Sequence, residues 1–212
     1  MKNLCVFGRV ASAVLFGSAL LASGQTALAS ELSYTYVEVK YADGEIGDVD
    51  ADGFRLTGSV ALGDTFFLAG GYQDVGGGFQ DSEFDLNVDV DLSLLRLGVG
   101  AHGPITDSID WVAQFDYLNA DAKASYEEGE IDSSDGNGYM LDVGLRGLVG
   151  EAAEYSIAII HSDGFSGGAS ATGFRVGGRY HVGETKLSVG LDYVQYHSEF
   201  DQLELGLRYQ FD

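Results

Sequence analysis

Hydrophobic and polar residues alternate strictly along the last stretch of the chain. From 203 to 211 every odd position is aliphatic or aromatic, and the even positions carry Glu204, Gly206, Arg208 and Gln210. A period of two over about nine residues is typical of a tilted strand that crosses a bilayer once. The same polar face, with glycine beside arginine, recurs in four earlier segments, and these five segments together hold all six arginines that follow Arg9.

The alternation defines ten segments in all. They cover residues 32–41, 54–62, 66–72, 95–101, 111–117, 139–145, 155–159, 174–182, 187–193 and 203–211. The linkers after the second, fourth, sixth and eighth segments are short, whereas those after the first, third and fifth are long and acidic. Short turns at one end and long loops at the other indicate an all-β fold, a single antiparallel up-and-down transmembrane β-barrel with both termini in the periplasm. We expect ten strands, with eight as the alternative.

One register change interrupts this pattern. Between 86 and 92 the apolar residues occupy even positions, whereas from Leu95 onward they occupy odd positions. Because a one-residue slip turns every side chain to the other face, a continuous strand here requires a β-bulge near residues 93–95.

The start of the chain has the form of a secretory signal peptide. Lys2 and Arg9 accompany an apolar run from 10 to 21, and Ala-Leu-Ala at 27–29 is a small-residue cleavage motif. We therefore expect residues 1–29 to be removed, with cleavage between Ala29 and Ser30, and residues 30–212 to form the barrel.

The composition of the chain limits its possible partners and fold further. After loss of the signal, nine basic residues would face 33 acidic ones, which argues against nucleic acid as a partner and favours cations. The one cysteine, Cys5, lies in the signal, so no disulfide is expected. No later run reaches 18 apolar residues, which excludes a helical span, and the abundance of glycine suits an all-β chain.

Aromatic residues mark both ends of the apolar faces. Two such belts, with aliphatic residues between them, are typical of strands that meet both interfaces of a bilayer. Toward the long loops lie Tyr41, Phe54, Tyr72, Tyr117, Tyr139, Phe174 and Tyr193. Toward the short turns lie Phe66, Trp111, Tyr155, Tyr180, Tyr209 and Phe211.

The opposite face is charged and therefore belongs inside. An arginine on the lipid face costs roughly 2–4 kcal/mol near the bilayer midplane, and guanidinium groups pair well with carboxylates in a confined lumen. The predicted lumen charge network is Glu38, Lys40, Arg55, Arg96, Asp116, Asp142, Arg146, Arg175, Arg179, Asp192, Glu204 and Arg208. Such a network either plugs the barrel or lines a narrow conducting pore.

At this point the chain resembles the small outer-membrane β-barrel proteins of the OmpA/OmpX-like kind found in diderm bacteria. The resemblance is carried by the whole pattern and by the alternating C-terminal residues that end at Tyr209 and Phe211, although Asp212 follows where the family usually ends on its aromatic. It implies a monomer in the bacterial outer membrane, inserted by the Bam assembly machinery among lipid and lipopolysaccharide. It also implies a role in envelope stability, adhesion or surface defence.

Asp48, Asp50 and Asp52 resemble the first half of an EF-hand loop, but its twelfth position is Ser59 rather than glutamate. We expect no cofactor other than weakly bound divalent cations, Ca²⁺ or Mg²⁺, at this site and the other acidic loops. Those loops are 42–53, 75–91 and 119–137, and the alternative is that their acids are simply solvated.

The triplets 161–163 and 197–199 each join histidine, serine and an acid at the long-loop end. Neighbours on a strand point to opposite faces, so these triplets do not form a catalytic triad. We expect a non-enzymatic protein with an envelope-structural or surface-interaction role (adhesion, biofilm or cation binding). The alternatives are a small porin and an outer-membrane lipid hydrolase.

Overall fold

The computed structural model describes residues 32–211, except 47–48, 82–85, 127–128, 166–168 and 197–199. The predicted signal, its cleavage site and Asp212 therefore lie outside the described residues. Among those that are described, no helix is long and apolar enough to cross a membrane.

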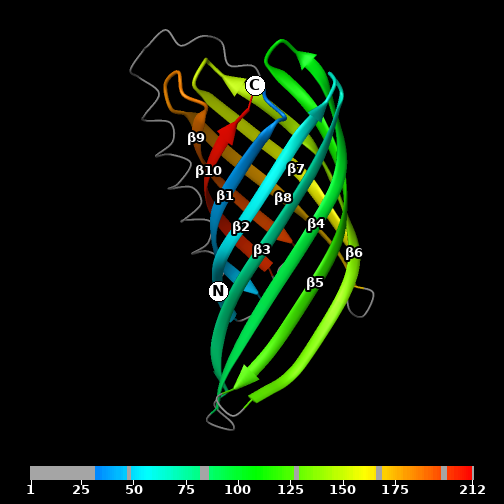
Figure 1. The fold of residues 1–212 in the computed structure, drawn as a ribbon, viewed down its shortest axis with the longest axis vertical. Helices are drawn as coiled ribbons and strands as arrows, with labels where there is room; N and C mark the ends of the chain where they lie inside the picture. Colours follow the sequence, from blue (N-terminus) through cyan, green and yellow to red (C-terminus); the bar gives the residue numbers. More distant parts are fainter. Residues whose placement is uncertain are drawn as a thin grey trace, which may run out of the picture.

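The described residues form ten strands in one closed antiparallel barrel, in which each strand pairs with its neighbours in sequence and β1 closes on β10 (Figure 1). The predicted ten strands are confirmed, and the eight-strand alternative is wrong. The strands are β1 Tyr36–Ile46, β2 Val49–Leu62, β3 Phe66–Asp81, β4 Leu86–Thr106, β5 Ile109–Tyr126, β6 Gly129–Val149, β7 Ala153–Phe165, β8 Ala169–His181, β9 Leu187–Tyr196 and β10 Phe200–Gln210.

The barrel is inverted relative to a soluble protein, because its large apolar residues point outward. Leu97 is 57% exposed, and Phe115, Val143, Ile159 and Leu205 are likewise exposed. The inward face instead buries carboxylates and guanidinium groups. A closed barrel leaves no unpaired sheet edge, and its greasy outer surface suits hydrocarbon.

Tight turns join the strands at one end of the barrel. Three of them use a glycine in the left-handed region, with φ of 70° at Gly63, 66° at Gly150 and 57° at Gly183, where a side chain would be strained. The chain ends lie at the same end, since Tyr36 pairs with Gln210. Short turns and termini lie at the periplasmic end of outer-membrane barrels, so we call this the periplasmic end and the opposite one the extracellular end.

The acidic segments predicted as long loops are instead paired strand. The β1–β2 ladder continues to Ile46 opposite Val49, and β3 pairs with β4 as far as Asp81 opposite Leu86. A span needs only about 9–11 residues, so β4 and β6, with 21 residues each, project well past the membrane. The β3–β4 and β5–β6 hairpins reach beyond the other strands, toward the bottom of Figure 1.

The predicted bulge near residues 93–95 is absent from the β3–β4 ladder, whose register runs unbroken from Phe66 opposite Ala101 to Asp81 opposite Leu86. The side chains of β4 keep one alternation along the whole strand, so the even-numbered Leu92 and Leu94 point into the barrel. The apolar residues move from odd to even positions because the inward-facing residues are apolar toward the extracellular end, while the strand itself stays regular.

Candidate functional site in the barrel interior

Charged side chains fill the middle of the lumen. The structure places all twelve residues of the predicted network on inward-facing positions of the strands. Nine of them are buried, and Arg55, Arg96 and Arg175 are half-buried. Taking charges out of water is costly, so such an interior is tolerable only where each charge finds a partner.

Lys40 is the centre of one cluster. Its Nζ lies 2.7 Å from Oδ2 of Asp192 and 2.8 Å from Oε2 of Glu204. The other oxygen of Glu204 is 2.5 Å from Nη1 of Arg55, although the Glu204 side chain has no solvent exposure. Four consecutive strands of the barrel, β2, β1, β10 and β9, are thus linked on their inner face by contacts between opposite charges. The two contacts from Lys40 are charge-assisted hydrogen bonds, which are the stronger class.

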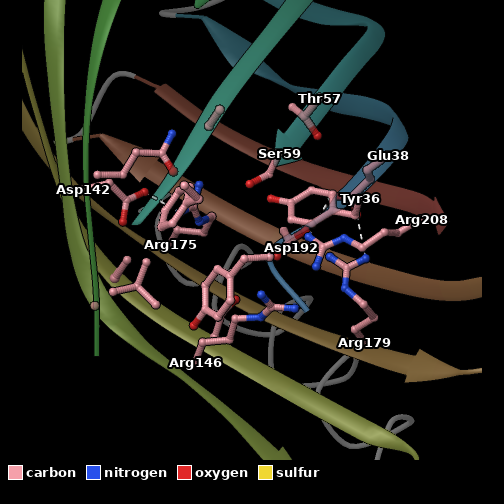
Figure 2. A pocket seen from close by; sticks show the side chains of 18 of the residues that line it. Tyr36, Glu38, Thr57, Ser59, Asp142, Arg146, Arg175, Arg179, Asp192 and Arg208 are labelled. Carbon is pink, nitrogen blue, oxygen red and sulfur yellow. Dashed lines mark hydrogen bonds and ion pairs between the residues drawn. The ribbon is translucent and has the colours of Figure 1, made fainter. Parts of the chain in front are cut away.

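Glu38 anchors a second cluster nearer the periplasm. Its two oxygens lie 2.6 Å from Nη1 of Arg179 and 3.0 Å from Nη2 of Arg208. The guanidinium carbon of Arg208 is also 3.7 Å from the centre of the Tyr36 ring, a cation–π contact. Figure 2 shows this stack of Tyr36, Glu38 and the two arginines.

Three arginines form a layer toward the extracellular side, and we call Arg55, Arg96 and Arg175 the arginine layer. Arg175 pairs with Asp142, and Nη2 of Arg96 lies 3.2 Å from Oδ2 of Asp116. The alternating pattern predicts both acids, Asp142 of β6 and Asp116 of β5, on the inward face of their strands.

Glu154 is a network member that the sequence analysis missed. It receives a two-pronged contact from Arg146, with Nε at 2.7 Å and Nη2 at 2.9 Å. Arg179 and Arg208 lie within 3.9 Å and 3.8 Å of the same carboxylate, and Nε2 of His181 within 3.7 Å. Glu154 could have been found by extending the inward positions of β7 one step below Ser156.

Tyr34 closes the periplasmic mouth, where the sequence analysis expected the first strand to begin. Residues 32–35 are not strand, and the buried Tyr34 ring stacks on His102 with centroids 3.6 Å apart. Its hydroxyl donates to Oδ2 of Asp110 at 2.9 Å, and Arg146 donates to the carbonyl of Ser33 at 2.8 Å. Burial raises the pKa of the Tyr34 hydroxyl, so this group remains a donor.

An apolar cluster closes the lumen toward the extracellular side, and sequence analysis missed it too. We call Leu118, Met140, Ile160 and Val194, with Leu94 and Tyr196 packed against them, the apolar cap. Its residues lie on the inward face, which the sequence analysis took to be polar. The only signal in the sequence is the set of even-numbered apolar residues in β4, from which the pattern predicts a bulge instead.

The predicted metal site is only partly described, because Asp48 lies outside the described residues. Asp50 and Asp52 face outward on β2, directly opposite Glu45 and Asp43 of β1. The hydroxyl of Tyr41 donates to Oδ2 of Asp52 at 2.9 Å. Within the described ranges, no group of three or more metal-ligating side chains is gathered.

The histidine–serine pair of β7 is divided between the two faces of the sheet. Ser162 is buried in the lumen, whereas His161 faces outward, with Nδ1 2.8 Å from Oγ1 of Thr172. The second triplet, 197–199, lies outside the described residues. The geometry of the first pair supports no nucleophile–base contact.

The predicted interface aromatics lie on the outer surface. Most are exposed, and Tyr155 and Tyr193 are half-buried. On the extracellular belt, Tyr41 and Tyr72 donate to acids just above them, Tyr72 to Oδ2 of Asp74 at 3.2 Å. Tyr139 likewise donates to Asp163 at 3.2 Å. Each ring thus sits at hydrocarbon level with its hydroxyl toward the polar side, as interface tyrosines do.

The comparisons agree with this architecture. No protein-family model matches the chain, and no curated protein matches it. Among solved structures, the transport unit of the autotransporter AIDA-I from Escherichia coli is similar with a TM-score of 0.53 and 11% identity, over 97% of this chain and 98% of that one. The NanC porin has a TM-score of 0.50 and 11% identity, over 82% and 100% of the two chains. Ail of Yersinia pestis has a TM-score of 0.43 and 14% identity, over 85% and 100%.

These likenesses concern the fold alone. The closed barrel, its outward apolar surface and its buried charges define the class: the protein is a transmembrane β-barrel of the outer-membrane type. The resemblance read from the sequence is confirmed at that level.

Proposed function

We propose that the protein is a non-enzymatic outer-membrane barrel that acts through its acidic extracellular hairpins. The observation that carries this proposal is the contrast between the two ends and the interior. Paired charges line the lumen between Tyr34 and the apolar cap, while the β3–β4 and β5–β6 hairpins project beyond the membrane. This arrangement suits a protein that interacts with partners at the cell surface better than one that transports solutes through its lumen.

The hairpins carry acids that face one another across the ladders. Asp121 lies directly opposite Asp135, and both are exposed. Asp43 opposite Asp52 repeats the arrangement on the β1–β2 hairpin. Like charges opposite one another on a sheet are destabilising, so a multivalent cation or a basic surface that binds between them relieves the repulsion. We therefore propose Ca²⁺, Mg²⁺ or cationic groups as the partners of these hairpins.

Paired variants test this role. We expect Asp121→Asn with Asp135→Asn to reduce Ca²⁺-dependent thermal stabilisation and cell-surface attachment. Asp64→Asn with Asp107→Asn removes two exposed acids from the periplasmic turns and serves as the matched control. Equal effects of the two double variants, or no effect of deleting the gene on attachment, biofilm or envelope integrity, would contradict the proposal.

A small channel is the second candidate, and one observation favours it. Cavities of about 130 and 290 Å³ lie in the periplasmic and extracellular parts of the lumen, and both are lined by Thr57 and the arginine layer. A single layer of side chains therefore separates them. Planar-bilayer recordings distinguish the candidates, because steps above roughly a few tens of picosiemens, as for a small-barrel bore, would favour the channel.

We also propose the surroundings that the family resemblance implies. These are insertion by the Bam machinery as a monomer, in a bilayer of outer-membrane lipid and lipopolysaccharide. Depleting the Bam machinery should remove the heat-modifiable, folded form from outer-membrane fractions.

A further inference from the structure

The cavity of about 290 Å³ in the extracellular part of the lumen is lined by two contrasting kinds of side chain. The arginine layer lines it together with four residues of the apolar cap, Leu118, Met140, Ile160 and Val194. Its upper lining includes Ser162, at the hairpin end of β7. A site with mainly apolar walls and a few convergent polar groups is the usual form of a small-molecule pocket.

The charge of this lining is opposite to that of the chain. The described residues that line it include three arginines and no acid, although the chain carries 33 acids against 11 basic residues. The periplasmic cavity, by contrast, is lined by Glu38, Asp142, Glu154 and Asp192 as well. The extracellular cavity thus presents guanidinium N–H donors and no carboxylate, because Asp116, Asp142 and Glu204, which pair with these arginines, lie outside its lining. Its other walls are largely hydrocarbon.

The arginines retain donors for a ligand. Arg96 and Arg175 each use a single nitrogen on their acids, Asp116 and Asp142. Their side chains are 18% and 23% exposed, and a guanidinium group has five N–H donors in a planar fork. Oγ1 of Thr57, which lines the same cavity, is buried without a hydrogen-bond partner. These groups match the two oxygens of a carboxylate.

We propose that this cavity binds a small amphipathic monocarboxylate, with the carboxylate on Arg96 and Arg175 and the hydrocarbon against the apolar cap. The volume is roughly twice the ~150 Å³ of a cavity that holds benzene, so about ten non-hydrogen atoms fit. Octanoate has that size and chemistry. The site is independent of the proposed role of the hairpins, because it lies inside the barrel.

Met140 provides a direct readout. It lines the cavity and is the only methionine besides Met1, so its ¹³C-labelled methyl group reports on ligands without any mutation. We expect octanoate, titrated into the full-length mature protein in lipid nanodiscs, to shift this resonance saturably. Octanol and octylamine should shift it at least tenfold more weakly at equal concentration, because neither presents an anion.

A charge-neutral variant tests the arginine. Arg175→Gln with Asp142→Asn keeps a polar pair and leaves neither partner as a lone charge, and its folding is checked by heat-modifiable migration on a gel. We expect octanoate to bind at least tenfold more weakly. The proposal is overturned if octanoate leaves Met140 unchanged, if the shift never saturates, or if octanol binds as well as octanoate. Should the double variant not fold, the comparison of the three ligands on the unmodified protein still decides.

Discussion

Ile159 and Ile160 are neighbours on β7, yet they lie in opposite environments: Ile159 is 65% exposed on the outer surface, and Ile160 is 1% exposed in the lumen. The alternation of a strand alone produces this difference. The pair therefore offers two identical side chains whose removal reports separately on lipid contact and on packing inside the barrel.

We expect Ile160→Ala to lower the free energy of unfolding by about 3–4 kcal/mol, as for buried aliphatic truncations. Ile159→Ala should cost at least about 1 kcal/mol less, because acyl chains fill the vacated space and no cavity remains. Urea titration in lipid vesicles measures both. An equal or larger cost at position 159 would be inconsistent with the apolar cap.

Glu154 should be the most sensitive of the buried acids near the periplasm, because Arg146, Arg179 and Arg208 all lie within 3.9 Å of it. Glu154→Gln leaves these cations undercompensated, so we expect a loss of about 3–5 kcal/mol, typical of a broken buried ion pair.

The same vesicle titration measures this loss, and Glu151→Gln, in the exposed turn before β7, is the control and should change little. Replacing both partners, as in Arg146→Met with Glu154→Leu, should recover part of the loss. A Glu154→Gln variant as stable as the control would show that the network does not stabilise the barrel.

Tyr34 should hold the N-terminal segment in the periplasmic mouth through its ring stack on His102 and its hydrogen bond to Asp110. Tyr34→Ala removes both contacts, so we expect proteinase K to cleave within residues 32–35 at least tenfold faster. Mass spectrometry of the N-terminus detects the cut. Tyr209→Ala, a lipid-facing tyrosine at the same end, is the control, and equal cleavage of the two variants would argue against the plug.

The sequence predicted the strands and their two faces well. A transmembrane barrel requires alternating apolar and polar residues, and the turn residues between the alternating stretches separate them into ten strands. The sequence predicted which charges point inward for the same reason. It could not reveal that residues 32–35 fold into the mouth, since Tyr34 continues the inward positions of β1 without any break in the pattern.

The position of each residue along the membrane normal could not be predicted from the sequence either. Acidic segments such as 75–91 were interpreted as loops because acids are rare in strands, yet a strand may continue past the bilayer into water. The apolar cap could not be predicted because Leu118, Met140 and Ile160 are single apolar residues on the inward face of three different strands. Only the assembled barrel brings them to one level.

The most direct test of the inverted barrel uses Trp111, the only tryptophan of the chain, which is 39% exposed on the outer surface in the periplasmic aromatic belt. In vesicles of brominated phospholipid its fluorescence should be strongly quenched, with little quenching by aqueous iodide. Fluorescence that bromolipid leaves unchanged and iodide quenches, in a protein that stays soluble without detergent, would contradict the assignment of the apolar face to lipid.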